Sequence, residues 1–84
     1  MEIIAYTLVG CTHCNTLKEL FQRANVSYDE VMVNKDITMT EFRDLYSHIT
    51  LFPFVVIDNE EVGGLVETAK LFLENGLVNP PRKK

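Results

Sequence analysis

The chain has 84 residues, which is enough for one small domain and too few for two lobes with separate cores. Its composition, 46% hydrophobic and 24% charged, is that of an ordinary soluble globular protein. The formal net charge of -4 argues against a nucleic-acid-binding surface, because such surfaces cluster Lys and Arg.

The N-terminal apolar run, residues 3–9, does not have the form of a secretory signal. It is short, it contains Tyr6 and Thr7, and it follows Glu2 where a signal peptide carries basic residues. No stretch approaches the roughly 20 apolar residues of a membrane span. We therefore expect a cytoplasmic protein, in a compartment that keeps thiols reduced.

The first part of the chain predicts a strand, a helix and a second strand. A strand over residues 2–9 is apolar on both faces, and Gly10 allows a sharp turn after it. A helix is predicted over residues 12–24, and Asn25 suits its C-cap. With a second strand over residues 27–33, the segment is a βαβ unit with parallel strands. The apolar face of the helix comprises Leu17, Leu20, Phe21 and Ala24.

A second helix begins where Thr38 and Glu41 have the spacing of a capping box. It is expected to end near His48. Its predicted apolar face comprises Phe42, Leu45, Tyr46 and Ile49.

The last part of the chain predicts two strands and a helix. Pro53 opens a third strand over residues 54–57, and residues 61–62 return as a short antiparallel strand that Gly63 and Gly64 end. The last helix ends with Gly76 at its C′ position. Its predicted apolar face comprises Leu65, Ala69 and Phe72.

The predicted order is β-α-β-α-β-β-α, an α/β fold in which three helices cover both faces of a four-stranded mixed sheet. Residues 1–78 are expected to form the domain. Residues 79–84 end in Arg82-Lys83-Lys84 and are expected to be a flexible basic tail.

The only two cysteines, Cys11 and Cys14, lie at the junction between the first strand and the first helix. A thiol attacks a disulfide only as the thiolate, and at a helix N-terminus or in a C-x-x-C turn the cysteine pKa falls to roughly 3.5–7.5. First-turn N–H groups and the helix dipole can stabilise a thiolate on Cys11, and Thr12 can offer a hydroxyl. The spacing lets Cys14 bridge Cys11, so Cys11 is the predicted nucleophile and Cys14 the predicted resolving thiol.

The residues alone leave other roles open for the two cysteines. They could be small core residues, or half of a zinc site, although the chain has no second C-x-x-C. A metal or iron–sulfur cluster shared between two chains is a further alternative. His13 is either a helper of the thiolate or an exposed spacer, and His48 is expected to be a helix-end residue. No metal site within one chain is predicted.

Three features in this order resemble the glutaredoxin family. They are the C-x-x-C after the first strand, Pro53 at the third strand and Gly63-Gly64 ahead of the last helix. The resemblance covers residues 2–76, and the small size and lack of Trp favour glutaredoxin over thioredoxin. It implies the thioredoxin fold.

The resemblance also implies roles at matching positions. Cys11 would exchange with glutathione mixed disulfides, and Cys14 would be the resolving thiol. Pro53 would be the family's cis-proline, facing the active-site turn. Phe52 would offer its backbone N–H and C=O to glutathione, as a strand pairs with a free edge.

Five more residues would contact the glutathione. Gly63 and Gly64 would let the chain pass close to it and expose the N-terminal amides of the last helix to a carboxylate, although a simple turn also explains them. Thr12 and His13 would lie beside it in the cysteine turn. Glu67 would contact its γ-glutamyl amine.

The chain departs from the family pattern around the expected glutathione site. Thr12 and His13 replace the usual Pro and Tyr, and Leu8-Val9-Gly10 replaces a segment that often carries Lys. Leu51 stands where Thr is usual, two residues before the proline, and Leu65-Val66 replaces polar or acidic residues. These differences bear on glutathione binding more than on thiol chemistry.

The sequence therefore predicts a glutathione-dependent thiol–disulfide oxidoreductase that reduces protein disulfides and glutathione mixed disulfides through Cys11 and Cys14. We expect glutathione as co-substrate, no bound cofactor, and disulfide-containing proteins as partners, of which ribonucleotide reductase is a common one in the family. We expect a monomer that binds neither nucleic acid nor a membrane. The alternatives are a redoxin reduced directly by thioredoxin reductase, and a non-enzymatic module that holds a metal or iron–sulfur cluster between two subunits.

Overall fold

A four-stranded mixed sheet forms the centre of the protein in a computed structural model that describes residues 1–78. The strands lie in the order β2-β1-β3-β4. β1 pairs parallel with β2 and antiparallel with β3, and β3 pairs antiparallel with β4. The elements along the chain are β1 (Ile3–Thr7), α1 (Thr12–Ala24), β2 (Asp29–Met32), α2 (Met39–Leu45), β3 (Phe54–Ile57), β4 (Glu60–Gly63) and α3 (Leu65–Glu74). The predicted thioredoxin-like arrangement is confirmed.

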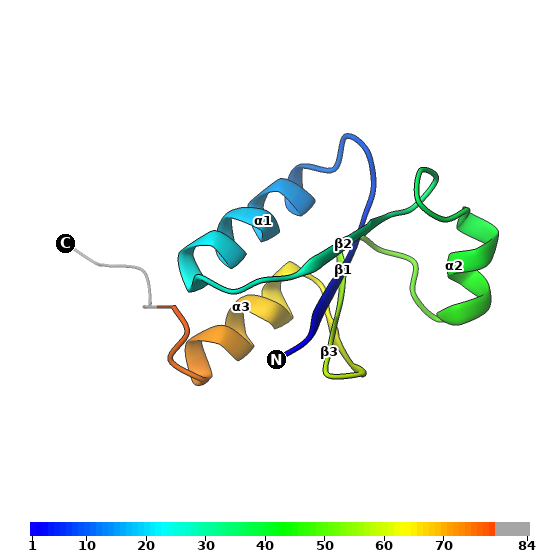
Figure 1. The fold of residues 1–84 in the computed structure, drawn as a ribbon. Coiled ribbons are helices and arrows are strands. Elements are labelled where there is room, and N and C mark those ends of the chain that lie inside the picture. The colour runs from blue at the N-terminus through cyan, green and yellow to red at the C-terminus, as the bar shows by residue number, and fades with distance from the viewer. Residues whose placement is uncertain (79–84) are drawn as a thin grey trace.

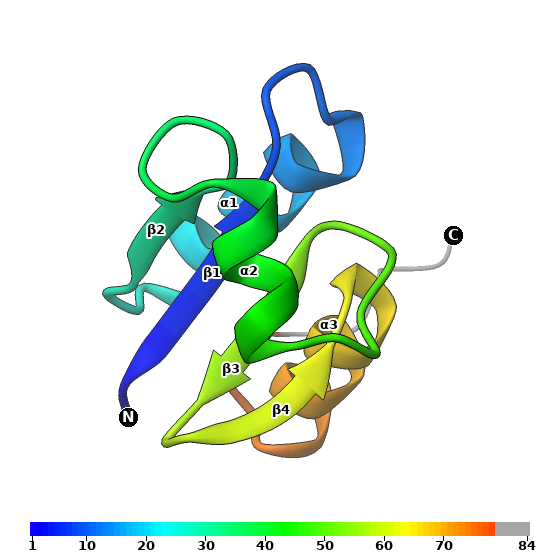
Figure 2. The ribbon, with the colours of Figure 1, turned by 90° about the vertical axis from the view of Figure 1, so that its right-hand side faces the viewer.

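The helices cover the two faces of the sheet unequally. Figure 1 shows α1 and α3 together on one face, and Figure 2 shows α2 alone on the other. The core is divided accordingly, because side chains alternate along each strand. The α1–α3 cluster comprises Ile3, Ala5, Leu17, Phe21, Val55, Ile57 and Phe72. The α2 cluster comprises Tyr6, Val33, Phe42, Phe54 and Val56.

Several predicted boundaries agree with the structure. The first helix and the third strand have the expected bounds, and Asn25 is the C-cap of α1 in the left-handed conformation, with φ of 56°. Thr38 and Glu41 form both hydrogen bonds of the capping box at the start of α2. β1 and β2 are shorter than predicted, while β4 extends over Glu60–Gly63.

The prediction was wrong at the end of the second helix. α2 ends at Leu45 and not near His48, and the side chain of Leu45 is 64% exposed. Tyr46 leaves the helical conformation with φ of -138°, so helical spacing no longer relates it to the residues before it. Tyr46 and Ile49 still pack against the α2 cluster, and they do so without Leu45.

The last helix also uses a face that differs from the predicted one. Thr68 and Phe72 are its buried residues, and Ala69 is only half-buried. The Thr68 hydroxyl donates a hydrogen bond to the carbonyl oxygen of Gly64 at 2.8 Å, which satisfies a polar group that would otherwise be buried without a partner. The predicted tail, residues 79–84, lies outside the described residues. Over residues 1–78, no helix is both long enough and apolar enough to cross a membrane.

Candidate functional site

Cys11 and Cys14 form a disulfide at the N-terminus of α1. Their Cα atoms are 5.2 Å apart, within the usual range for a disulfide. Cys11 is the N-cap residue, and the backbone N–H of Cys14 donates to its sulfur at 3.1 Å. Cys14 is 2% exposed, whereas Cys11 is half-buried. The more accessible sulfur is therefore the one at the tip of the helix.

The surrounding sequence explains this placement. Gly10 has a φ of +76°, which lets the chain turn sharply from β1 into α1. The first turn of α1 carries no acidic residue, so no side-chain charge there offsets the positive end of the helix dipole. The amide of Cys14 and this dipole are positioned to stabilise a thiolate on Cys11 when the pair is reduced.

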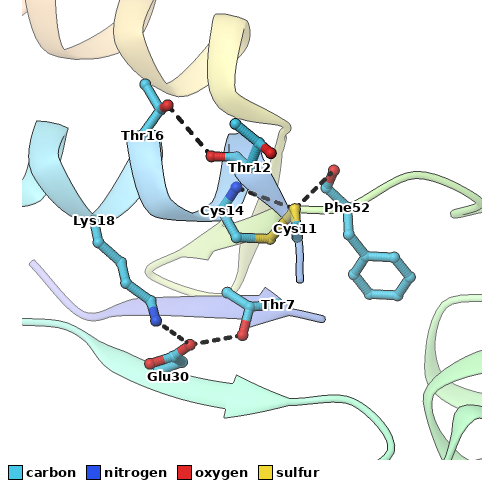
Figure 3. The surroundings of a disulfide bond; sticks show 8 residues. All are labelled: Thr7, Cys11, Thr12, Cys14, Thr16, Lys18, Glu30 and Phe52. Carbon is cyan, nitrogen blue, oxygen red and sulfur yellow. Dashed lines mark hydrogen bonds and ion pairs between the residues drawn. A yellow bond between two sulfur atoms is a disulfide. The ribbon is translucent and has the colours of Figure 1, made fainter. Parts of the chain in front are cut away.

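The segment before β3 forms the second side of the site. The Phe52–Pro53 peptide bond is cis, as the family resemblance implied. The carbonyl oxygen of Phe52 lies 4.0 Å from the Cys11 sulfur, and Figure 3 shows it pointing toward that sulfur while the ring points away. The ring packs against Phe42 of α2, with 5.0 Å between centroids. Within residues 1–78, neither the N–H nor the C=O of Phe52 is bonded to the backbone.

The two glycines form the third side. A Cβ atom on Gly64 would lie 3.3 Å from the carbonyl oxygen of Pro53, so the close approach of these two segments depends on glycine. Gly63 has a φ of +127°, a conformation that is almost restricted to glycine. The backbone conformation therefore favours glycine at position 63, and tight packing favours it at position 64, in addition to any role that they have in binding.

Glu67 caps the helix that these glycines precede. Its Oε1 accepts a hydrogen bond from the Gly64 N–H at 2.9 Å. The carboxylate thus already satisfies one amide at the N-terminus of α3, and it places negative charge beside the others. Its predicted contact with a γ-glutamyl amine stays a prediction.

The structure thus brings together Cys11, Cys14, Phe52, Pro53 and Gly64. Thr12 and His13 are exposed in the first turn of α1, next to the disulfide in sequence. In the described part of the chain, no hydrogen bond joins His13 to either sulfur. His48 pairs with Glu61 of β4 at 2.5 Å, which ties the loop after α2 to the sheet.

A hydrogen-bonded group next to the turn was not predicted. The hydroxyl of Thr7, which is 1% exposed, donates to Glu30 at 2.7 Å, and Lys18 pairs with the same carboxylate oxygen at 2.9 Å. Figure 3 shows this group beside the disulfide, spanning β1, β2 and α1. Burial raises the pKa of Glu30, but the hydrogen bonds from Lys18 and Thr7 and the Lys18 charge outweigh it and leave this pKa below its usual value.

A weak sequence signal pointed to this group. Lys18 lies four residues after Cys14, on the helix that packs against the sheet. The register that pairs Glu30 with the buried Ala5 is known only from the structure. A carboxylate at such a strand position needs a partner, and a cation on the covering helix is the obvious one.

The main groove found on the described surface lies away from this site. A groove of about 580 Å³ lies between β4 and α3, but neither cysteine lines it. Over residues 1–78, no group of three or more His, Cys, Asp or Glu side chains could hold a metal ion.

Comparisons with known proteins point to one family. The family described as Glutaredoxin matches residues 3–62. The protein called glutaredoxin 1 from Rickettsia prowazekii (strain Madrid E) is 35% identical over 78 residues, which cover 89% of this chain and 81% of the relative. Glutaredoxin 1 from Rickettsia bellii (strain RML369-C) is 35% identical over 66 residues, or 74% of this chain and 67% of the relative.

A solved structure agrees with the sequence relatives. The crystal structure of glutaredoxin 1 from Francisella tularensis, complexed with cacodylate, superposes with a TM-score of 0.74 at 28% identity. The match covers 90% of this chain and 95% of that one. The similarity therefore extends through the sheet and all three helices.

Proposed function

This chain belongs to the glutaredoxin family, and we propose that it reduces protein disulfides and glutathione mixed disulfides with electrons from glutathione. A Cys11–Cys14 pair in this family supports thiol–disulfide oxidoreductase activity. The observation that carries the proposal is the asymmetry of the pair. Cys11, which is half-buried, accepts an amide hydrogen bond through its sulfur at the helix tip, and Cys14 is buried.

In the reducing half-reaction, the Cys11 thiolate attacks a substrate disulfide. One substrate sulfur bonds to Cys11, and the other leaves as a thiolate that takes up a proton. The Cys14 thiol then loses its proton and attacks the Cys11 sulfur, which releases the second substrate thiol and forms the Cys11–Cys14 disulfide. Two glutathione molecules return the pair to the dithiol and leave as glutathione disulfide.

Within residues 1–78, the N–H and C=O of Phe52 form no backbone hydrogen bond, which supports binding of the cysteinyl part of glutathione. Both groups lie beside Cys11 and can pair with an extended peptide as a neighbouring strand does. A buckwheat glutaredoxin of the same fold, at 18% identity, was solved as a glutathione complex, which makes glutathione the first ligand to test. We propose further that the protein works as a cytoplasmic monomer without a bound cofactor.

Serine substitutions test the two cysteine roles separately. Cys11→Ser should abolish exchange with every disulfide, because it removes the attacking sulfur. Cys14→Ser should abolish reduction of protein disulfides and spare exchange with glutathione mixed disulfides, which needs one thiol. Loss of both activities in Cys14→Ser, with Cys11→Ser active, would reverse the assignment.

A redoxin reduced directly by thioredoxin reductase is the second candidate. Leu51 and Val66 are exposed apolar residues at positions where the family usually has polar ones. The loss of these polar residues favours electron transfer from thioredoxin reductase over electron transfer from glutathione. A coupled assay distinguishes the two electron sources. NADPH oxidation with glutathione and glutathione reductase, but not with thioredoxin reductase, supports the proposal, and the opposite result overturns it.

A further inference from the structure

The three most exposed apolar side chains in residues 1–78 lie within two positions, along the chain, of residues that form the site. Val9 is 78% exposed, Leu51 is 80% exposed and Val66 is 73% exposed. Val9 precedes Cys11 by two residues, and Leu51 is bonded to Phe52, whose carbonyl oxygen faces the Cys11 sulfur. Val66 follows Gly64, which abuts Pro53, by two residues. We call these three residues the apolar rim.

Isolated exposed apolar residues are normal and need no explanation. Leu45 and Met1 are of that kind, at 64% and 61% exposure, and neither adjoins a residue of the site. The apolar rim differs because one of its members adjoins each of the three segments that form the site. An apolar surface gathered around a reactive group marks a place where a partner binds.

The charges near the rim disfavour an anionic partner. The Glu67 carboxylate lies at the Gly64 amide, one residue from Val66. Lys18, on the helix that carries the cysteines, is already paired with Glu30. The chain as a whole has a formal net charge of -4. Glutathione carries two carboxylates and one ammonium group, so its proposed binding here depends on the backbone of Phe52 and not on charge pairs at the rim.

We propose that the apolar rim selects polypeptide disulfides whose cysteine is flanked by uncharged, apolar side chains. This inference rests on the thiol–disulfide exchange proposed above and names the substrate class of that site. Val9, Leu51 and Val66 are its specificity-determining residues.

The chemistry of exchange brings such a substrate against the rim. Cys11 must bond covalently to the substrate sulfur, so the residues that flank the substrate cysteine lie close to the residues around Cys11. If Phe52 pairs with the substrate backbone, the substrate is extended, and each flanking residue lies about 3.4 Å further along it. Side chains alternate along an extended chain, so the residues two positions before and after the substrate cysteine point the same way as that cysteine and contact the rim. An apolar flank removes apolar area from water on both partners, whereas an acidic flank does not.

A single-turnover experiment tests this selectivity without any electron source. Protein is reduced, freed of reductant and mixed with a peptide disulfide in excess, and the peptide thiols released are measured by acid quench and chromatography. The two substrates are disulfide dimers of acetylated, amidated Leu-Gly-Cys-Gly-Leu and Glu-Gly-Cys-Gly-Glu. We expect the second-order rate constant for the apolar peptide to be about tenfold higher than for the acidic one. The reason is that the apolar peptide partly buries the three side chains of the apolar rim.

Polar substitutions assign the preference to the rim. In the variant that combines Val9→Thr, Leu51→Thr and Val66→Thr, the apolar peptide should react about tenfold more slowly. The acidic peptide should react within about twofold of its former rate. Leu51→Thr alone should show part of the loss. Leu45→Thr, the same substitution on α2 and away from the cysteines, is the matched control and should change neither rate.

Four results would overturn the inference. They are equal rates for the two peptides, an equal loss on both peptides in the triple variant, no loss in that variant, and a loss in Leu45→Thr as large as in Leu51→Thr. A dimer in sedimentation experiments that the triple variant abolishes would assign the rim to a second copy of the chain instead. If the glutathione-coupled assay fails while the peptide preference holds, the proposed electron source is wrong and the substrate class stands.

Discussion

Gly63 has a backbone conformation that other residues rarely adopt. Its φ is +127°, and a Cβ atom there would lie 3.0 Å from Cγ of Glu67. Gly63→Ala should therefore lower the free energy of unfolding by about 1–3 kcal/mol, through backbone strain and displacement of the Glu67 side chain. Urea denaturation measures this. Gly76→Ala is the matched control, because Gly76 has a φ of +70° and open space around it, and it should cost less.

The contribution of Glu30 to the free energy of unfolding should depend on pH. The pKa of Glu30 is lowered in the folded protein, so its contribution to stability is present above the pKa of an unfolded Glu and is lost as pH falls through the folded pKa. Glu30→Gln should lower the free energy of unfolding by about 1 kcal/mol at neutral pH. The difference from the unsubstituted chain should shrink as the pH is lowered toward 3.

Urea denaturation across this pH range checks the expectation. Glu19→Gln, on the exposed side of α1, is the control and should show little difference at any pH. A difference for Glu30→Gln that stays constant down to pH 3 would contradict the role of the carboxylate charge.

Among the elements, α2 depends most on its cap, because it has only seven residues. Thr38→Ala removes the hydroxyl that accepts the Glu41 N–H at 3.0 Å. It should cost about 1 kcal/mol, and the melting temperature should fall by roughly 5 °C. Thr40→Ala, inside the same helix, should be neutral or slightly stabilising, because Ala is the better helix former. Thermal unfolding that shows equal losses in both variants would contradict the capping role.

The elements also show what the sequence could predict. The bounds of α1 followed from an apolar spacing that runs from Leu17 to Ala24 and from Asn25 as its C-cap, and the cysteine pair followed from its place at the start of that helix. Leu45 was assigned to the core wrongly because α2 stops there, and local sequence does not reveal where tertiary contacts draw Tyr46 out of the helix. The hydrogen bond from the Gly64 N–H to the Glu67 carboxylate could not be predicted, because it depends on the backbone conformation at the two glycines, which only the fold defines.

In the whole molecule, the two hydrophobic clusters support different parts of the site. Phe42 packs against Phe52, at 5.0 Å between centroids, and it belongs to the α2 cluster. Phe21 belongs to the α1–α3 cluster, where its ring packs against Phe72 at 5.8 Å. Phe42→Leu and Phe21→Leu should each cost about 1–2 kcal/mol of stability, since each loses aromatic contacts in a buried position.

Their effects on activity should differ. Phe42→Leu removes the support of Phe52, whose carbonyl oxygen lies 4.0 Å from the Cys11 sulfur, and should slow exchange with a peptide disulfide by roughly threefold. Phe21→Leu should leave this rate unchanged at a temperature where both variants are folded. Single-turnover rates measure the difference, and equal rates in the two variants would show that Phe52 does not depend on the α2 cluster.

The division of the core between two faces of the sheet also affects how such a chain can diverge. The cysteines are carried by α1, which packs on one face, while the segment before Pro53 packs on the other through Phe52. Substitutions under α2 can therefore move the Phe52 segment that faces the Cys11 sulfur, while the packing of the helix that carries the cysteines is preserved on the other face. Selection or protein engineering can thus change the substrate side of the site and the cysteine side through different parts of the core, within 84 residues.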